Sequence, residues 1–136
     1  MTSRYVAGEE LPEQTYVVTR ADLVRYAGAS GDFNPIHWSD RVASSVGLPG
    51  VIAHGMYTLA LAARALDTWA GATGRVRELG CKFTKAVVVP DDETGAEVLV
   101  RGTVTTVTDD GGVHIALDVS CGGEKVLGRP RAVLSA

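Results

Sequence analysis

The stretch GMYTLALAARALDTW, residues 55–69, is apolar or small almost throughout. Most of its residues favour helix, so it predicts a helix from Gly55 to Trp69. Gly71 follows as a stop signal, because glycine readily adopts the left-handed conformation that ends many helices. A helix with apolar residues on nearly every side must be enclosed, so we expect the rest of the chain to form a wall around it.

The second half of the chain has the pattern of strands that could build this wall. Apolar and polar residues alternate around Val100 and around Ile115, which is typical of strands with one buried face. Glycine-rich segments at 109–112 and 122–124 lie where hairpin turns are needed. The four predicted strands lie at residues 78–89, 98–105, 113–121 and 126–134.

The first half has helix signals and one short strand. Residues 14–18 predict a strand, and Thr19 to Asp22 resemble a capping box that opens a helix ending at Gly28–Gly31. Asn34–Pro35 predicts a second helix start, and Gly47 and Pro49 end that helix. Together, the predicted helices and strands indicate an α+β fold. We expect one antiparallel sheet curled around one apolar helix, with residues 32–49 as a helical flap. We expect residues 1–136 to be one domain.

Charge and composition exclude several classes of protein. The chain has 136 residues, with 13 basic and 16 acidic side chains and a net charge of −3, so nothing in it attracts nucleic acid or an anionic membrane. The start lacks a secretory apolar region, and glycines and a proline interrupt the uncharged stretch 42–63. We therefore expect a cytoplasmic protein without a membrane span. Cys81 and Cys121 fit free buried thiols better than a disulfide.

The segment YAGASGDFNPIH, residues 26–37, is the most informative for chemistry. It sets Asp32 and His37 five residues apart, across a glycine turn and a helix start, so both side chains can face one cavity. Taken alone, Asp32 is more simply a turn or cap residue and His37 a polar residue in a first helical turn. Spacing alone does not decide between these interpretations, and the grouping of Gly31, Asp32, Asn34, Pro35 and His37 gains its weight from a family resemblance of the full string.

The full string resembles the signature of the MaoC-like, R-specific enoyl-thioester hydratase and dehydratase family. Within that family the chain is most similar to the HadB-type catalytic subunit of the actinobacterial (3R)-hydroxyacyl-acyl-carrier-protein dehydratase. The similarity rests on LPEQTY (11–16), NPIHW (34–38) and AHGM (53–56), and the order of elements extends it over nearly the whole chain. The resemblance implies a hot-dog fold, in which a sheet wraps around a central helix.

The resemblance also implies roles for individual residues. Asp32 and His37 become the acid–base pair, and the backbone N–H of Gly55 becomes the oxyanion donor. Gly31 would permit the turn that presents Asp32, and Asn34 would orient the pair or hold a water molecule. We assign the C2 proton to His37 and the C3 hydroxyl to Asp32, although the opposite assignment is open. Burial of Asp32 would favour the acid role.

Other candidate residues have simpler explanations. His54 precedes the oxyanion glycine and could contact substrate, but a hydrogen-bonded structural histidine is as good an interpretation. His114 is predicted on the polar face of its strand. The histidines and cysteines show no recognised metal-ligand spacing, so we expect no metal, and the glycine pairs lack a nucleotide-binding context, so we expect no cofactor. Ser30 and Ser39 have no nucleophile elbow.

The function expected from this resemblance is reversible dehydration of (3R)-hydroxyacyl thioesters to trans-2-enoyl thioesters. The carrier could be acyl carrier protein or coenzyme A, and acyl length, direction and pathway stay open. We expect a homodimer or a heterodimer with a related hot-dog subunit, since a lone curved sheet leaves an open edge. Alternatives are a non-catalytic acyl-binding subunit and a hot-dog thioesterase. Carrier contacts are sought among five basic residues: Lys82, Lys85, Arg101, Arg129 and Arg131.

Overall fold

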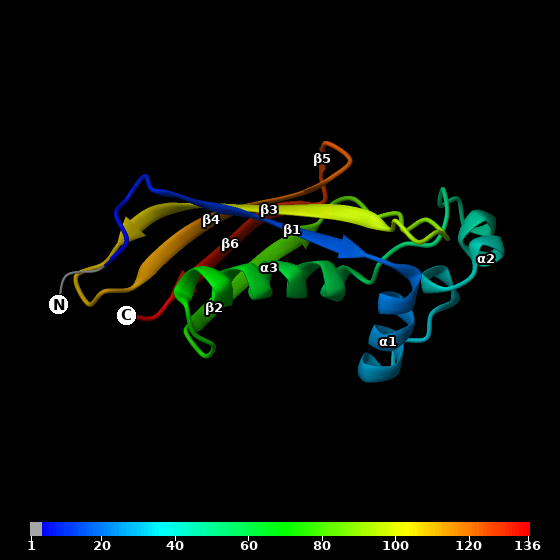
Figure 1. Ribbon diagram of the computed structural model, residues 1–136, viewed down its shortest axis with the longest axis horizontal. Coiled ribbons are helices and arrows are strands. Elements are labelled where there is room, and N and C mark those ends of the chain that lie inside the picture. The colour runs from blue at the N-terminus through cyan, green and yellow to red at the C-terminus, as the bar shows by residue number, and fades with distance from the viewer. Residues whose placement is uncertain (1–3) are drawn as a thin grey trace.

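The computed structural model describes residues 4–136. In this part of the chain the strands form one antiparallel sheet, with α3 along one face and α1 and α2 at one end (Figure 1). The helical elements are α1 (Arg20–Ser30), the 3-10 turn η1 (Pro35–His37), α2 (Asp40–Ser45) and α3 (Gly55–Ala70). The strands are β1 (Glu10–Val18), β2 (Val76–Phe83), β3 (Ala96–Val107), β4 (Val113–Cys121), β5 (Glu124–Lys125) and β6 (Leu127–Leu134).

The sheet has the order β1-β3-β4-β6-β2, and the short β5 pairs with β4. Alternating side chains of β3 and β4 are fully buried, as the sequence pattern predicts; they include Val98, Val100 and Val119. Both predicted hairpin turns are present: Thr108 and Gly112 close the first, and Gly122 and Gly123 form the second. The predicted α+β architecture of a sheet packed on an apolar helix is therefore confirmed.

Helix α3 forms where the apolar stretch predicts it and ends at Gly71, which has a φ of 73°. Its inner side packs on the sheet, and the indole N–H of Trp69 donates to the Pro12 carbonyl at 2.7 Å. The outer side is not covered: Met56 and Arg64 are exposed. The expectation that the helix is enclosed is wrong within one chain, because a single sheet covers only one side of a helix.

The start of the chain follows the predicted pattern with one extension. Strand β1 begins at Glu10 rather than Gln14, because it already pairs with β3 there and then passes through a bulge between Leu11 and Gln14. Helix α1 has the predicted capping box: the Asp22 N–H donates to Thr19 Oγ1, and the Thr19 N–H donates to the Asp22 carboxylate.

The predicted continuous helix from Asn34–Pro35 to Gly47 is wrong. The Asn34–Pro35 signal produces only η1, and Trp38, with φ −149°, leaves the helical conformation. Ser39 then acts as a new N-cap, its Oγ accepting from the Val42 N–H, and α2 runs to Ser45. The reason is local, because Ser39–Asp40 is itself a helix start that competes with continuation of the first turn.

The predicted strand 78–89 is also wrong beyond Phe83. The amides of Thr84 and Lys85 both donate to the Val126 carbonyl, so the chain turns away from β6. Residues 87–89 pair instead with residues 51–53, through Ala53 N–H to the Val87 carbonyl and Val89 N–H to the Val51 carbonyl, each 2.9 Å. This small ribbon connects the end of the flap to the loop after β2.

Two further expectations concern the cysteines and the membrane. Cys81 and Cys121 are free, but both are only partly buried, and this burial raises the pKa of each thiol. Within residues 4–136, no helix has both the length and the apolar character needed to cross a bilayer.

Candidate active site

The turn after α1 presents Asp32. Gly31 is the C-cap of α1, has a φ of 76°, and donates its N–H to the Ala27 carbonyl at 2.9 Å. No atom lies within 4 Å of the position that a Cβ would occupy at Gly31, so the backbone conformation and not lack of space calls for glycine. The turn predicted for Gly31 from the sequence is present.

The carboxylate of Asp32 is oriented by its own loop. Its Oδ1 accepts a hydrogen bond from the Asn34 N–H at 3.1 Å, and its Oδ2 lies 3.9 Å from Nε2 of His37. The Asp32 N–H donates to the Ser30 hydroxyl at 3.1 Å. One carboxylate oxygen is therefore held by the backbone while the other faces the imidazole. The side chain is 52% exposed, so a single chain does not provide the burial that an acid role favours.

Asn34 acts on the turn that carries His37. Its side-chain oxygen accepts from the Ile36 N–H at 3.2 Å, and its carbonyl accepts from the His37 N–H at 3.0 Å. Pro35 occupies the first position of η1, where a missing N–H costs nothing. Asn34 thus stabilises the backbone of the turn that carries His37.

The hydrogen-bond partner of His37 determines which of its ring nitrogens carries a hydrogen. Its Nδ1 lies 2.7 Å from the Ile52 carbonyl oxygen, which can only accept, so Nδ1 carries the hydrogen. In the neutral ring, Nε2 then has a free lone pair, and it is this atom that faces Asp32. The gap of 3.9 Å is too long for a direct hydrogen bond, but one oxygen atom could lie within hydrogen-bond distance of both groups.

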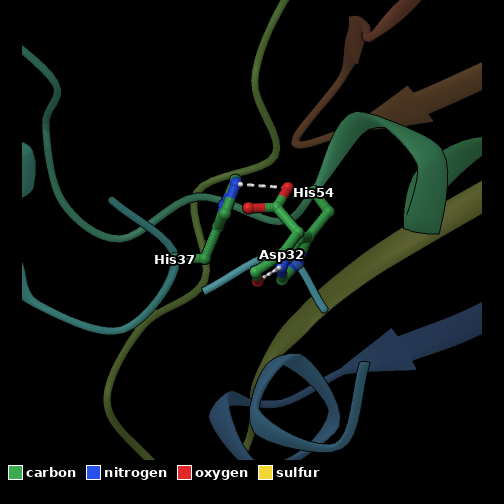
Figure 2. Close-up of side chains that lie close together, drawn as sticks. All are labelled: Asp32, His37 and His54. Atoms are coloured by element: carbon green, nitrogen blue, oxygen red, sulfur yellow. Dashed lines mark hydrogen bonds and ion pairs between the residues drawn. The ribbon is translucent and has the colours of Figure 1, made fainter. Parts of the chain in front are cut away.

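His54 is the residue that sequence reasoning left outside the site. It is 2% exposed, and its Nε2 lies 3.1 Å from the Asp32 carbonyl oxygen. Its ring stacks on that of His37, with centroids 3.8 Å apart and an interplanar angle of 21°. Figure 2 shows the three residues close together, with the Asp32 carboxylate facing His37 and the Asp32 carbonyl facing His54. In the sequence, only its position next to Gly55 pointed to His54 as a residue of the site.

Gly55 is the first residue of α3, and the side chain of its N-cap, His54, makes no capping hydrogen bond. The first N–H groups of a helix have no partner within it and carry the positive end of the helix dipole. A Cβ at Gly55 would lie 3.0 Å from the ring of Phe83, so glycine permits this close approach. A pocket of about 240 Å³ opens here, and its lining includes Gly55, Thr58, Phe83 and Lys85.

The structure gathers three groups of metal-ligand type that sequence spacing did not reveal. Ligand atoms of Asp32, His37 and His54 lie within 4.8 Å of one another. A metal bound by both histidines must lie about 2.0 Å from a nitrogen of each ring and near the plane of each ring. The rings of His37 and His54 are stacked in nearly parallel planes, so their lone pairs do not converge on one point. This arrangement suits two stacked imidazoles and not joint ligation, so the absence of a metal requirement stays a prediction.

Two ionisable residues near the site, Tyr57 and Asp40, have shifted pKa values. Burial raises the pKa of Tyr57, which contacts Tyr26 edge to face, and Tyr26 in turn packs on His54 with ring centroids 4.8 Å apart. At the other end of the flap, the Val51 N–H and then the Arg20 guanidinium hold the pKa of Asp40 below its ordinary value. Asp40 thus ties the start of α2 to α1 and to the 51–53 segment.

The five basic residues considered for carrier contacts do not share one surface. Lys85 lines the pocket beside Gly55 and pairs with Glu124, whereas Arg101 pairs with Glu13 on another hollow. Arg131 lines a separate hollow across β2, β4 and β6. Lys82 and Arg129 are exposed. Of the five, Lys85 is the one placed at the pocket next to the α3 N-terminus.

Comparison with known proteins gives the relationships of the chain. The model of the family described as "MaoC like domain" matches residues 5–118. The chain is 43% identical over 65 residues to the fatty acid synthase subunit beta of Saccharomyces cerevisiae. It is 47% identical over 49 residues to 3-hydroxyacyl-thioester dehydratase X of Mycobacterium tuberculosis. These alignments cover 46% and 36% of this chain, but it spans only 3% and 18% of the two relatives.

Solved structures share the fold over almost the whole chain. A structure titled "MaoC-like dehydratase" has a TM-score of 0.93 at 32% identity, covering 97% of this chain and 41% of that one. The R-hydratase PhaJ1 of Pseudomonas aeruginosa has a TM-score of 0.84 at 27% identity, covering 97% of this chain and 82% of that one.

Proposed function

Because this chain belongs to the MaoC-like domain family, we propose that it is a hydro-lyase that interconverts (3R)-hydroxyacyl and trans-2-enoyl thioesters. The observation that carries the proposal is the approach of Asp32 Oδ2 to His37 Nε2, at 3.9 Å. Elimination of water across C2–C3 needs one group to take a proton and another to give one, on the same face of the substrate. The names of the dehydratase and hydratase relatives agree with this chemistry.

In the dehydration direction, the neutral His37 ring accepts the C2 proton at Nε2, where its lone pair is free. The electron pair of the C2–H bond forms the C2–C3 double bond, and the C3–O bond breaks. The Asp32 carboxyl gives its proton to the departing hydroxyl, which leaves as water, and a proton passes from His37 to Asp32 to restore the pair. Hydration runs the same steps in reverse. The acid role requires that substrate or a second subunit shield Asp32 from water.

The thioester oxygen gains negative charge as the C2 proton departs. In this proposal the Gly55 N–H, at the positive end of the 16-residue helix α3, stabilises that charge by a hydrogen bond and by the helix dipole. Phe83, against which Gly55 lies, and Thr58 form the pocket wall next to this N–H. The acyl thioester would enter at this end of α3.

A second hot-dog subunit is part of the proposal. Large apolar side chains are exposed on the flap, at the start of α3 and at the end of β2: Phe33, Trp38, Val46, Met56 and Phe83. We expect a partner, identical or related, to bury these side chains and the uncovered outer side of α3. Light scattering should give a dimer, either of this chain alone or with a related subunit. Full activity of a monomer would overturn this part of the proposal.

The activity can be tested with trans-2-enoyl thioesters of several lengths on coenzyme A and on acyl carrier protein. We expect the absorbance of the conjugated double bond to fall as water adds, with a (3R)-hydroxyacyl thioester as product. Release of free thiol would instead identify a thioesterase. No reaction on either carrier, alone or with a related subunit, would indicate a binding subunit and would overturn the proposal.

A further inference from the structure

We propose that His54 is a positioning residue that holds the acid–base pair of the flap in register with the N-terminus of α3. This inference rests on the proposed function. His54 contacts all three functional groups: it bonds to the backbone of Asp32, stacks on the ring of His37, and directly precedes Gly55 (Figure 2). It contacts the backbone of one reacting residue and the ring of the other, and only 2% of it is exposed.

The first contact joins two parts of the chain that are distant in sequence. The Asp32 carbonyl only accepts, so His54 donates to it from Nε2, and this bond links α3 to the flap across 22 residues. Since the Asp32 side chain is oriented by its own loop, fixing the Asp32 backbone fixes where the carboxylate lies relative to α3.

The second contact restrains the imidazole of His37. That ring is held at Nδ1 by the Ile52 carbonyl, and His54 lies flat against it with centroids 3.8 Å apart. Rotation of the His37 ring would turn Nε2 away from Asp32 and would break both contacts. Tyr26 also packs on His54, at 4.8 Å, which restricts movement of His54 itself.

The tautomer of His54 leaves one atom without a partner. Because Nε2 carries the hydrogen, Nδ1 is an acceptor, and it is buried with no hydrogen-bond partner among the described residues. An unpaired buried acceptor costs stability, so stability alone gives no reason for an imidazole here. The two contacts do give a reason, since they need a flat ring together with an N–H at its far end.

Three substitutions separate the two contacts. His54→Gln keeps an N–H donor at about the same reach and removes the ring, His54→Phe keeps the ring and removes the donor, and His54→Ala removes both. Loss of one hydrogen bond or one ring contact of this kind corresponds to about a tenfold change in rate. We expect kcat to fall about tenfold in His54→Gln and in His54→Phe and about a hundredfold in His54→Ala. KM should change less than about twofold, because His54 does not touch substrate.

The matched control is His114→Gln, which makes the same exchange at an exposed histidine of β4 and should leave kcat unchanged. Nitrogen-15 NMR of His37 gives a readout that needs no turnover, and only three histidines have to be assigned. We expect one Nδ1–H tautomer of His37 in the unaltered chain and a mixture in His54→Ala. If His54→Ala does not fold, His54→Gln and His54→Phe carry the test.

Wild-type kcat in folded His54 variants, or a change confined to KM, would overturn the positioning role. A single His37 tautomer in every variant would do the same. An unaltered chain that is inactive on all enoyl thioesters would overturn the proposed function instead. In that case the NMR comparison still tests whether His54 holds the His37 ring.

Discussion

The sheet with α3 and the flap of residues 32–49 are held in different ways. Core valines such as Val98 and Val100 are 0% exposed, so burial of apolar surface fixes the sheet and α3. The flap exposes Phe33, Trp38 and Val46 and is tied down mainly by polar contacts, including those that Arg20 and Val51 make to Asp40. The proposed acid and base thus lie on the part held mainly by polar contacts, and the proposed oxyanion donor lies at the start of the helix held by apolar burial.

The largest expected effect concerns the chemistry on the flap. Asp32→Asn keeps an acceptor for the Asn34 N–H but cannot exchange a proton, and His37→Ala removes the base. Each should lower turnover of enoyl thioesters by roughly 10²-fold or more, while thermal unfolding shows little change for Asp32→Asn. Near-normal turnover in both variants would contradict the mechanism.

The next effect contrasts the stability of the two regions. Val100→Ala in β3 removes buried methyl groups and should lower the free energy of unfolding by about 2 kcal/mol. Val46→Ala on the flap, where the side chain is 63% exposed, should change it by less than about 0.5 kcal/mol. Urea denaturation of the two variants measures both values. Equal losses would mean that the flap has a core of its own.

A smaller effect tests the turn where the flap begins. Gly31→Ala must adopt a positive φ and should cost about 1–2 kcal/mol, although nothing obstructs the added methyl group. Gly28→Ala, three residues earlier within α1, has equally open space and an ordinary φ, so it should stabilise by up to about 1 kcal/mol. We expect the thermal unfolding temperature to fall in Gly31→Ala and to rise in Gly28→Ala. A change in the same direction in both variants would argue against a strained turn at Gly31.

The smallest effect concerns the tether of the flap. The pKa of Asp40 is lower in the folded chain than when unfolded, so its contribution to stability is complete above the unfolded pKa of about 3.9 and is lost as the pH falls through the folded pKa. Asp40→Asn should therefore be less stable than the unaltered chain at pH 7. The loss of unfolding free energy should be smaller than the loss in Gly31→Ala. Urea midpoints at pH 7 and pH 3 should converge at the lower pH, and a constant difference would exclude the ionised carboxylate as the cause.

The contrast between the regions also explains what the sequence could predict. The alternation around Val100 and the apolar run 55–69 predicted the strands and α3, because buried faces impose a period on the chain. The strand after Phe83 was mispredicted, since residues 87–89 are apolar whether they pair with β6 or, as observed, with residues 51–53. Periodicity does not specify which partner such a segment chooses.

The site was predictable in part. The motif around Asp32 and His37 led to two residues that do lie together, and to Gly31 at a turn. The contacts of His37 and His54 depend on the carbonyls of Ile52 and Asp32, respectively, which only the folded chain brings into reach. No local sequence signal encodes such long-range backbone contacts.

The most direct test of the central claim is a double-variant comparison of turnover. If Asp32 and His37 act as one acid–base unit, Asp32→Asn combined with His37→Ala should be no more than about threefold slower than the slower single variant, because either change already disables the pair. The measurement is the rate of absorbance loss of a trans-2-enoyl thioester for the unaltered chain, both single variants and the double variant. Losses that multiply in the double variant would show that the two residues act independently and would contradict the account.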